Sequence, residues 1–165
     1  SKGYDLFGKA VLKVLKKYKD WSAYVVGDEP RDKLDFKHKR LKNFGFKEHK
    51  EVIKIYKKTS IAVVCSRWDE PFGRTSLEAA ANGCAVIISN RGGLPETITN
   101  GRILKKLNVN EIYKNIEGVT EKRAADLDFL GKSYAEGIEI AKTMSTDDSS
   151  AFVNGILDSF FNEKL

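Results

Sequence analysis

A stretch near the middle of the chain constrains the fold most strongly. Two continuous apolar runs, Ser60–Cys65 and Cys84–Ile88, flank a short helix predicted over Thr75–Asn82. Apolar runs without polar alternation are typical of strands that are covered on both faces. Gly83 stands directly after the helix, where glycine commonly ends one. A strand, a helix and a second strand in this order predict a βαβ unit with parallel strands and a right-handed crossover.

The rest of the chain continues this alternation. The spacing of apolar residues predicts helices over 4–18, 48–58, 109–118, 122–144 and 147–163, strands over 21–26, 42–46 and 101–104, and a loop over 91–95. We therefore expect an α/β domain with a Rossmann-like parallel sheet, helices on both faces of the sheet and extra helices at the C-terminal end. A doubly wound domain normally begins with a strand. We expect that this strand precedes Ser1 and is missing from the chain.

Length and composition bound the organisation of the chain. Its 165 residues, 41% of them hydrophobic, suffice for one domain with its own core, and we expect a single domain over 1–165. No apolar run reaches the ~20 residues that span a membrane, and the first residues do not resemble a secretory signal. Cys65 and Cys84 lie in apolar runs, which predicts reduced, buried thiols in a cytoplasmic protein.

The chain carries a net charge of +6, which is compatible with nucleic acid, an anionic membrane surface or a phosphorylated ligand. Its lysines are scattered through the predicted helices, where most of them are expected to face solvent. No RNA-binding or DNA-reading motif accompanies them, so we expect no nucleic-acid partner.

Ligands of open α/β sheets bind beyond the carboxyl ends of the strands. Three loops lie there, over 27–30, 66–73 and 89–96. The second passes from a buried strand through Pro71, Phe72 and Gly73 directly into a helix. The first turn of that helix offers backbone N–H groups and a positive dipole end. A diphosphate is the group that such a turn binds best.

Two carboxylates flank this turn: Glu70 precedes it and Glu78 lies in the first turns of the helix. A carboxylate accepts hydrogen bonds from two hydroxyl groups, which suits a ribose or hexose diol. Structural explanations remain open at this stage. Thr75 and Glu78 match a capping box, Glu70 could be an ordinary surface carboxylate, and Arg74 and Arg91 could be solvated.

The segment Arg67–Gly83 resembles the Glu-x7-Glu motif of retaining glycosyltransferases of the group 1, or family 4, type. Four further segments resemble motifs of that family in the same order: Lys2–Leu6, Tyr24–Asp28, Asn43–Phe46 and Arg91–Glu96. The pattern extends over 2–104, and five matches in order are highly specific. The resemblance implies the C-terminal, donor-binding half of a GT-B fold. It also implies that the N-terminal acceptor domain is absent from this chain.

The resemblance gives roles to the matching residues. Glu78 would bind the ribose hydroxyls, and Glu70 would contact the transferred sugar close to the reacting centre, so these two are the expected catalytic residues. Lys2 would neutralise the leaving diphosphate. The other expected donor-binding residues are Gly27 and Phe46 beside the base, Phe72 and Gly73 facing the sugar, Thr75 and Ser76 near the diphosphate, and Arg74, Gly92 and Gly93.

The implied reaction transfers a sugar from a nucleoside diphosphate to an acceptor hydroxyl with retained configuration, in lipopolysaccharide, glycolipid or other surface-glycan synthesis. We expect no metal cofactor, because the chain has no Asp-x-Asp and only two histidines, His38 and His49. The arginine that the family usually carries upstream of its Lys-Gly pair has no counterpart here. The isolated chain is therefore expected to bind a donor weakly and to transfer little or nothing.

Other functions stay open. A GT-B-like nucleotide-sugar epimerase or a phosphorylase would share the fold, and a non-catalytic nucleotide-binding module would fit half of a cleft. Many relatives act on lipid-linked acceptors, so we expect a cytoplasmic protein that can sit at the inner face of the membrane. Anionic lipid attracts basic domains there by roughly 1 kcal/mol per nearby Lys or Arg.

Overall fold

The structure is a computed structural model that describes residues 2–27 and 36–122. The chain forms two compact units, Ser1–Gly118 and Val119–Leu165, and every candidate site residue belongs to the first unit. The predicted helices over 122–144 and 147–163 lie outside the described residues, apart from residue 122. The elements of the first unit are α1 (Tyr4–Lys17), β1 (Ala23–Val25), β2 (Leu41–Asn43), α2 (His49–Lys57), β3 (Ile61–Val64), α3 (Arg74–Ala81), β4 (Ala85–Ser89), the 3-10 helix η1 (Leu94–Thr97), β5 (Arg102–Leu104) and a helix that begins at residue 109.

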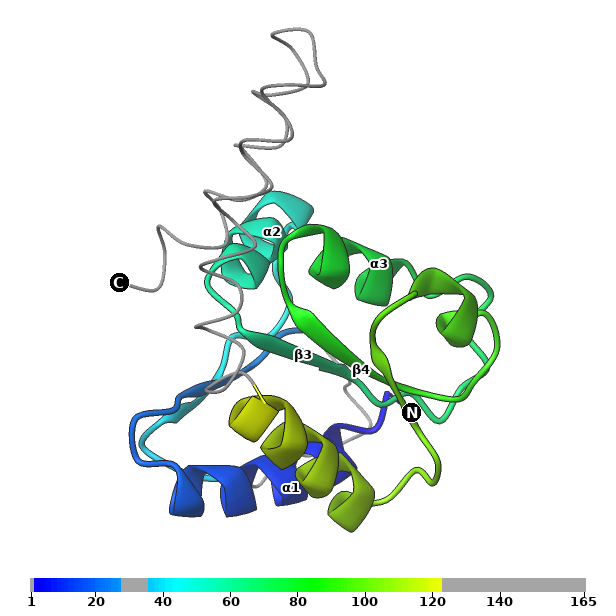
Figure 1. The fold of residues 1–165 in the computed structure, drawn as a ribbon. Helices are drawn as coiled ribbons and strands as arrows, with labels where there is room; N and C mark the ends of the chain where they lie inside the picture. Colours follow the sequence, from blue (N-terminus) through cyan, green and yellow to red (C-terminus); the bar gives the residue numbers. More distant parts are fainter. Residues whose placement is uncertain (1, 28–35, 123–165) are drawn as a thin grey trace, which may run out of the picture. The chain divides into compact units, whose positions relative to one another are not determined.

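All paired strands run parallel, and helices cover the sheet on both sides. β3 pairs with β4 in the register Ala62 to Val86, and β4 pairs with β5 in the register Ile88 to Ile103. α2 and α3 lie on one side of β3 and β4, whereas α1 and residues 109–118 lie on the other (Figure 1). The predicted α/β class with a Rossmann-like layering is thereby confirmed.

The strands form two sheets, because β1 pairs with β2 and the three-stranded sheet begins at β3. In the usual doubly wound order, the first strand of the domain lies between its second and fourth strands. The strand that we expect before Ser1 would therefore stand between β1 and β3. That strand remains a prediction.

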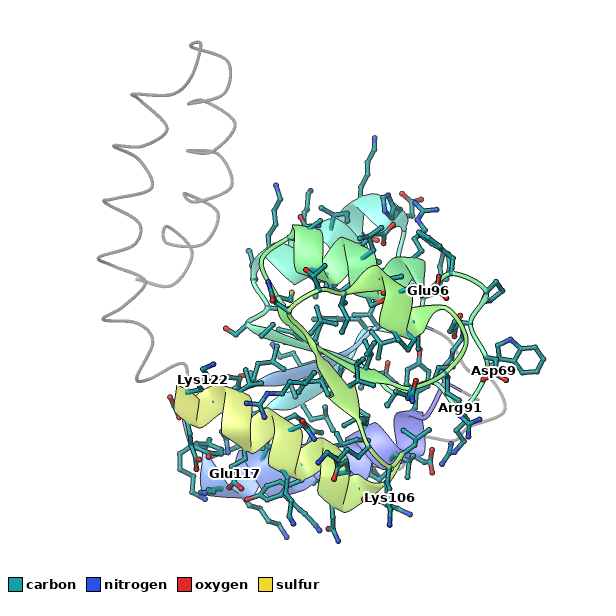
Figure 2. All side chains as sticks on the ribbon, turned by 45° about the vertical axis from the view of Figure 1, so that its right-hand side comes forward. Asp69, Arg91, Glu96, Lys106, Glu117 and Lys122 are labelled. Atoms are coloured by element: carbon teal, nitrogen blue, oxygen red, sulfur yellow. The ribbon has the colours of Figure 1, made fainter. Side chains whose placement is uncertain are left out.

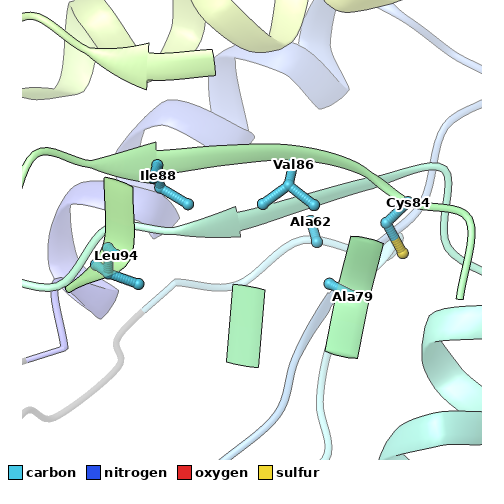
Figure 3. Packing of buried hydrophobic residues seen from close by; sticks show 6 residues of the cluster. All are labelled: Ala62, Ala79, Cys84, Val86, Ile88 and Leu94. Carbon is cyan, nitrogen blue, oxygen red and sulfur yellow. The ribbon is translucent and has the colours of Figure 1, made fainter. Parts of the chain in front are cut away.

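The core of the larger sheet lies between its strands and α3. Six buried residues form one cluster there, and Figure 3 labels them: Ala62, Ala79, Cys84, Val86, Ile88 and Leu94. β4 is buried on both faces, as its apolar run predicts. The same prediction holds only in part for β3, in which Ala62 is buried and its three neighbours are partly buried. β3 has its paired neighbour β4 along one edge, and β1 is not hydrogen-bonded to the other.

Several element boundaries differ from the predicted ones. β2 ends at Asn43, three residues early, because the chain turns at Gly45, whose N–H donates to Asn43 Oδ1 at 2.9 Å. The expected loop over 91–95 is partly helical, since η1 begins at Leu94. The end of α3 agrees with expectation: Gly83 N–H donates to Ala80 O at 3.0 Å, as a terminating glycine does.

Candidate functional site

The loop between β3 and α3 contributes one partner, Glu70, to the first ion pair of the site. Lys2 Nζ contacts Glu70 Oε1, although 68 positions separate the two residues in the sequence. The Glu70 side chain is 18% exposed and that of Lys2 is 51% exposed. Glu70 is therefore a partly buried carboxylate with a cationic partner.

Lys2 reaches Glu70 because the start of α1 is fixed against the end of β3. The Cys65 thiol donates a hydrogen bond to Gly3 O at 3.3 Å, and a Cβ at Gly3 would lie 2.1 Å from Cys65 O. Arg67 adds a fork of two hydrogen bonds of 2.6 Å to the Asp5 carboxylate. The hydrogen bonds from Arg67 hold the pKa of Asp5 below its usual value.

The Gly92–Gly93 loop fixes Glu70 from the other side. Gly93 N–H donates to Glu70 O at 2.7 Å. A Cβ at Gly92 would lie 2.3 Å from Glu70 O, and one at Gly93 would lie 2.7 Å from Pro71 O. Both glycines are thus required by close backbone packing. Their expected contact with a donor remains a prediction.

Asp69 and Arg91 lie together at the edge of the molecule where β3 and β4 end (Figure 2). Arg91 Nη1 is 3.9 Å from Asp69 Oδ1, and both side chains are largely exposed. This loose surface pair stands beside the Glu70 backbone without contacting the Glu70 carboxylate.

α3 begins at Arg74, and the capping-box interpretation of its start is wrong. The N-cap residue is Gly73, and no side chain caps the helix. Ser76 is buried, with its hydroxyl 2.6 Å from Gly73 O and 2.6 Å from Thr97 Oγ1. Ser76 therefore supports the turn from inside, whereas Thr75 is exposed on the outer side of the same turn.

Glu78 forms the second charged cluster with Arg74 and His49. Arg74 Nε lies 2.5 Å from Glu78 Oε1, and His49 Nε2 lies 3.0 Å from the same oxygen. Burial opposes ionisation of Glu78, but the hydrogen bonds from Arg74 and His49 outweigh it and hold the pKa of Glu78 below its usual value. Sequence reasoning missed His49, since only the packing of α2 against α3 brings it there (Figure 1).

The two residues expected beside a nucleotide base lie at the ends of β1 and β2. Gly27 N–H donates to Gly45 O at 2.8 Å, which places the neighbouring Phe46 at this edge. Tyr4 Oη donates to Val26 O at 3.1 Å and joins the edge to the start of α1. Phe46 is 76% exposed, and Phe72, in the β3–α3 loop, is 61% exposed.

Two further findings concern the described residues as a set. Within 2–27 and 36–122, no three His, Cys, Asp or Glu side chains gather closely enough to hold a metal ion. No helix in these same ranges combines the length and the apolar character needed to cross a bilayer.

A parallel α/β domain with a charged turn at the carboxyl ends of its strands is typical of enzymes that bind phosphorylated ligands. The family described as glycosyl transferases group 1 matches residues 1–136, and the chain belongs to this family.

The chain is also similar to three differently named proteins. The chain is 32% identical over 110 residues to the lipopolysaccharide core biosynthesis mannosyltransferase LpsB of Rhizobium meliloti, a match that covers 61% of this chain and 31% of that protein. It is 41% identical over 58 residues to the glycogen synthase of Mycobacterium tuberculosis, covering 35% and 14%. It is 40% identical over 57 residues to spore coat protein SA of Bacillus subtilis, covering 34% and 15%. The matches thus span about a third or less of each relative.

Proposed function

We propose that this chain binds a nucleoside-diphosphate sugar and forms the C-terminal, donor-binding side of a retaining GT-B glycosyltransferase. The observation that carries the proposal is the meeting of Lys2 and Glu70 at the carboxyl end of β3, directly before the start of α3. A cation and a helix N-terminus suit the diphosphate of a nucleotide sugar, and the carboxylate beside them suits the hydroxyls of its sugar.

The proposal gives each charged group a role in binding the donor. Lys2 and the first turn of α3 stabilise the negative charge that develops on the leaving diphosphate. Glu70 accepts hydrogen bonds from the hydroxyls of the transferred sugar, and Glu78 accepts them from the ribose. Gly27 and Phe46 border the base. No metal is required by these roles, so donor binding should be unchanged by EDTA.

A thermal-shift screen tests the proposal. The 165-residue chain is mixed with UDP, GDP and ADP and with UDP-glucose, GDP-mannose and ADP-glucose at millimolar concentration. One base should raise the melting temperature, and calorimetry then gives its affinity. Glu78→Ala should weaken that affinity by roughly tenfold or more, as expected for losing a charge-assisted hydrogen bond in a site.

Glu51→Ala is the matched control. Glu51 lies on α2, which packs against α3, and its exposed carboxylate is 3.7 Å from Lys47 Nζ. The substitution should leave the affinity unchanged. Absence of binding by all six compounds would contradict the proposal.

The activity of the whole enzyme is a further part of the proposal. The acceptor is bound by an N-terminal domain, so the isolated chain transfers little or no sugar. Joining the chain to such a domain should increase transfer by orders of magnitude, because the acceptor is then oriented beside the donor. Equal transfer with and without that domain would show that the acceptor side lies in the present chain.

We further propose that the acceptor is linked to lipid and that the enzyme works at the inner, anionic face of a membrane. The net charge of +6 and the exposed lysines of α1, Lys9, Lys13 and Lys16, support this. Sedimentation with vesicles of phosphatidylglycerol should bind the chain at low salt and release it at high salt. Binding that is absent or insensitive to salt would favour an acceptor in solution.

A further inference from the structure

In the proposed function, two side chains bind neighbouring parts of the donor. In the structure, these two side chains contact each other. Lys2 is directed at the diphosphate and Glu70 at the sugar, yet Lys2 Nζ and Glu70 Oε1 form an ion pair. Lys2 can bind a diphosphate fully only if it gives up part of this contact. The ion pair therefore competes with the phosphates for Lys2.

The backbone segments that carry Lys2 and Glu70 are held by close packing. A change of ion-pair partner therefore requires movement of the side chains and not of the backbone. Gly3 packs against Cys65, and the glycine loop packs against Glu70 and Pro71. The half-exposed Lys2 side chain is free to turn toward a phosphate, whereas the Glu70 carboxylate is mostly covered and stays where it is. Glu70 then loses its cation.

A partly buried carboxylate without a partner is unfavourable, because burial penalises its charge. The hydroxyls of an intact nucleotide sugar can donate hydrogen bonds to Glu70 and replace the lost partner. A nucleoside diphosphate, the product of transfer, has no sugar at that position. Glu70 thus remains uncompensated in the product complex.

From this we infer that the Lys2–Glu70 ion pair makes the site prefer the nucleotide sugar over the free nucleoside diphosphate and so promotes release of the product. The inference rests on the proposed function. It gives Glu70 a role in specificity that acts through Lys2, in addition to its proposed contact with the sugar.

Calorimetry with a matched pair of ligands tests the inference. The pair is the nucleoside diphosphate and nucleotide sugar selected by the thermal-shift screen, for example UDP and UDP-glucose. Glu70→Gln keeps the size of the side chain but removes its charge. It should tighten binding of the diphosphate by roughly two- to fivefold, the range for one partly exposed ion pair. Binding of the nucleotide sugar should not tighten.

Asp69→Asn is the matched control. It removes one negative charge from the adjacent residue, whose ion-pair partner is Arg91. A general loss of charge favours both phosphorylated ligands equally, so Asp69→Asn should leave the ratio of the two affinities unchanged. In a Lys2→Met background, Glu70→Gln should no longer tighten the diphosphate, because no cation is left to release.

Three outcomes decide the matter. Tighter diphosphate binding by Glu70→Gln that requires Lys2 supports the inference. The same change from Asp69→Asn, or from Glu70→Gln in the Lys2→Met background, overturns it and leaves the proposed function intact. Absence of binding by either ligand to the unchanged chain and to every variant overturns the proposed function and the inference with it.

Discussion

His49 Nε2 lies 3.0 Å from Glu78 Oε1, although the two residues are 29 positions apart and on different helices. Arg74 contacts the same oxygen from one turn earlier in α3. Two donors on one oxygen hold the carboxylate in a single orientation. Without them, the carboxylate could adopt several orientations, and a ligand diol would bind only one of these. His49 is therefore a positioning residue in the proposed site.

We predict that His49→Ala weakens binding of the nucleoside diphosphate by roughly two- to fivefold, corresponding to one exposed charged hydrogen bond. His49→Gln retains an N–H donor and should restore part of the affinity. His38→Ala is the control, since His38 is the other histidine and its ring accepts a hydrogen bond from the Arg40 backbone N–H at 3.1 Å. Equal losses of affinity with His38→Ala and His49→Ala would contradict the assignment.

The ionisation of Glu78 gives a prediction for pH. Burial raises its pKa, but the hydrogen bonds from Arg74 and His49 lower it further, so the net pKa lies below the usual 4.5. A carboxyl whose pKa is lowered by folding adds stability above the usual pKa and loses that contribution as the pH falls through the lowered pKa. The stability difference between the unchanged chain and Glu78→Gln should therefore shrink as the pH falls below the usual pKa of a glutamate carboxyl. Urea unfolding at pH values below about 5 measures it, and a difference that grows on further acidification would be inconsistent with the lowered pKa of Glu78.

The sequence predicted the βαβ order and the two glutamates, because buried strands, glycine turns and paired carboxylates are local patterns. It did not predict His49, whose contact with Glu78 depends on how α2 packs on α3. It also overestimated the burial of β3, because burial depends on which strands lie alongside, and sequence gives that only indirectly. The capping box failed for a further reason: α3 begins at Arg74, one residue before the predicted start, with Gly73 as its N-cap, so Thr75 does not occupy the cap position.

Gly92 tests the packing of the loop beneath Glu70. Its φ is 51° and a Cβ would lie 2.3 Å from Glu70 O, whereas Gly45, with φ 61°, has nothing within 4 Å of a Cβ. Gly45→Ala should cost about 1 kcal/mol for the left-handed backbone alone. Gly92→Ala should cost clearly more, about 2–4 kcal/mol, because the clash is with backbone and cannot be relieved by a rotamer change. Urea unfolding of both variants compares them directly, and equal costs would show that the close approach to Glu70 contributes nothing.

Leu94 tests whether η1 contributes to the core of the larger sheet. Its side chain is fully buried beside Ile88 and Ala79, whereas Leu77 on α3 is 44% exposed. Leu94→Ala should lower the free energy of unfolding by about 2–5 kcal/mol, the range for emptying a leucine site in a core. Leu77→Ala should change it by less than about 1 kcal/mol. A small effect at Leu94 would mean that the loop after β4 is not packed on α3.

Cys65 reports on the contact that places Lys2. Burial raises the pKa of its thiol to about 11, and the thiolate is the form that reacts with disulfide reagents. Near pH 8, this shift alone reduces the thiolate fraction roughly a hundredfold relative to a thiol at the ordinary pKa of 9.0. In a Cys84→Ala variant, where Cys65 is the remaining cysteine, labelling by a disulfide reagent should therefore be slow until urea unfolds the chain.

Gly3→Ala then separates burial from the contact itself. A Cβ at Gly3 would lie 2.1 Å from Cys65 O, so the start of α1 must move away from the end of β3. Labelling of Cys65 should accelerate, and affinity for the diphosphate should fall in parallel, because Lys2 moves together with Gly3. Faster labelling with unchanged affinity would show that Lys2 is not positioned through Gly3. Unchanged labelling would show that α1 does not cover the thiol.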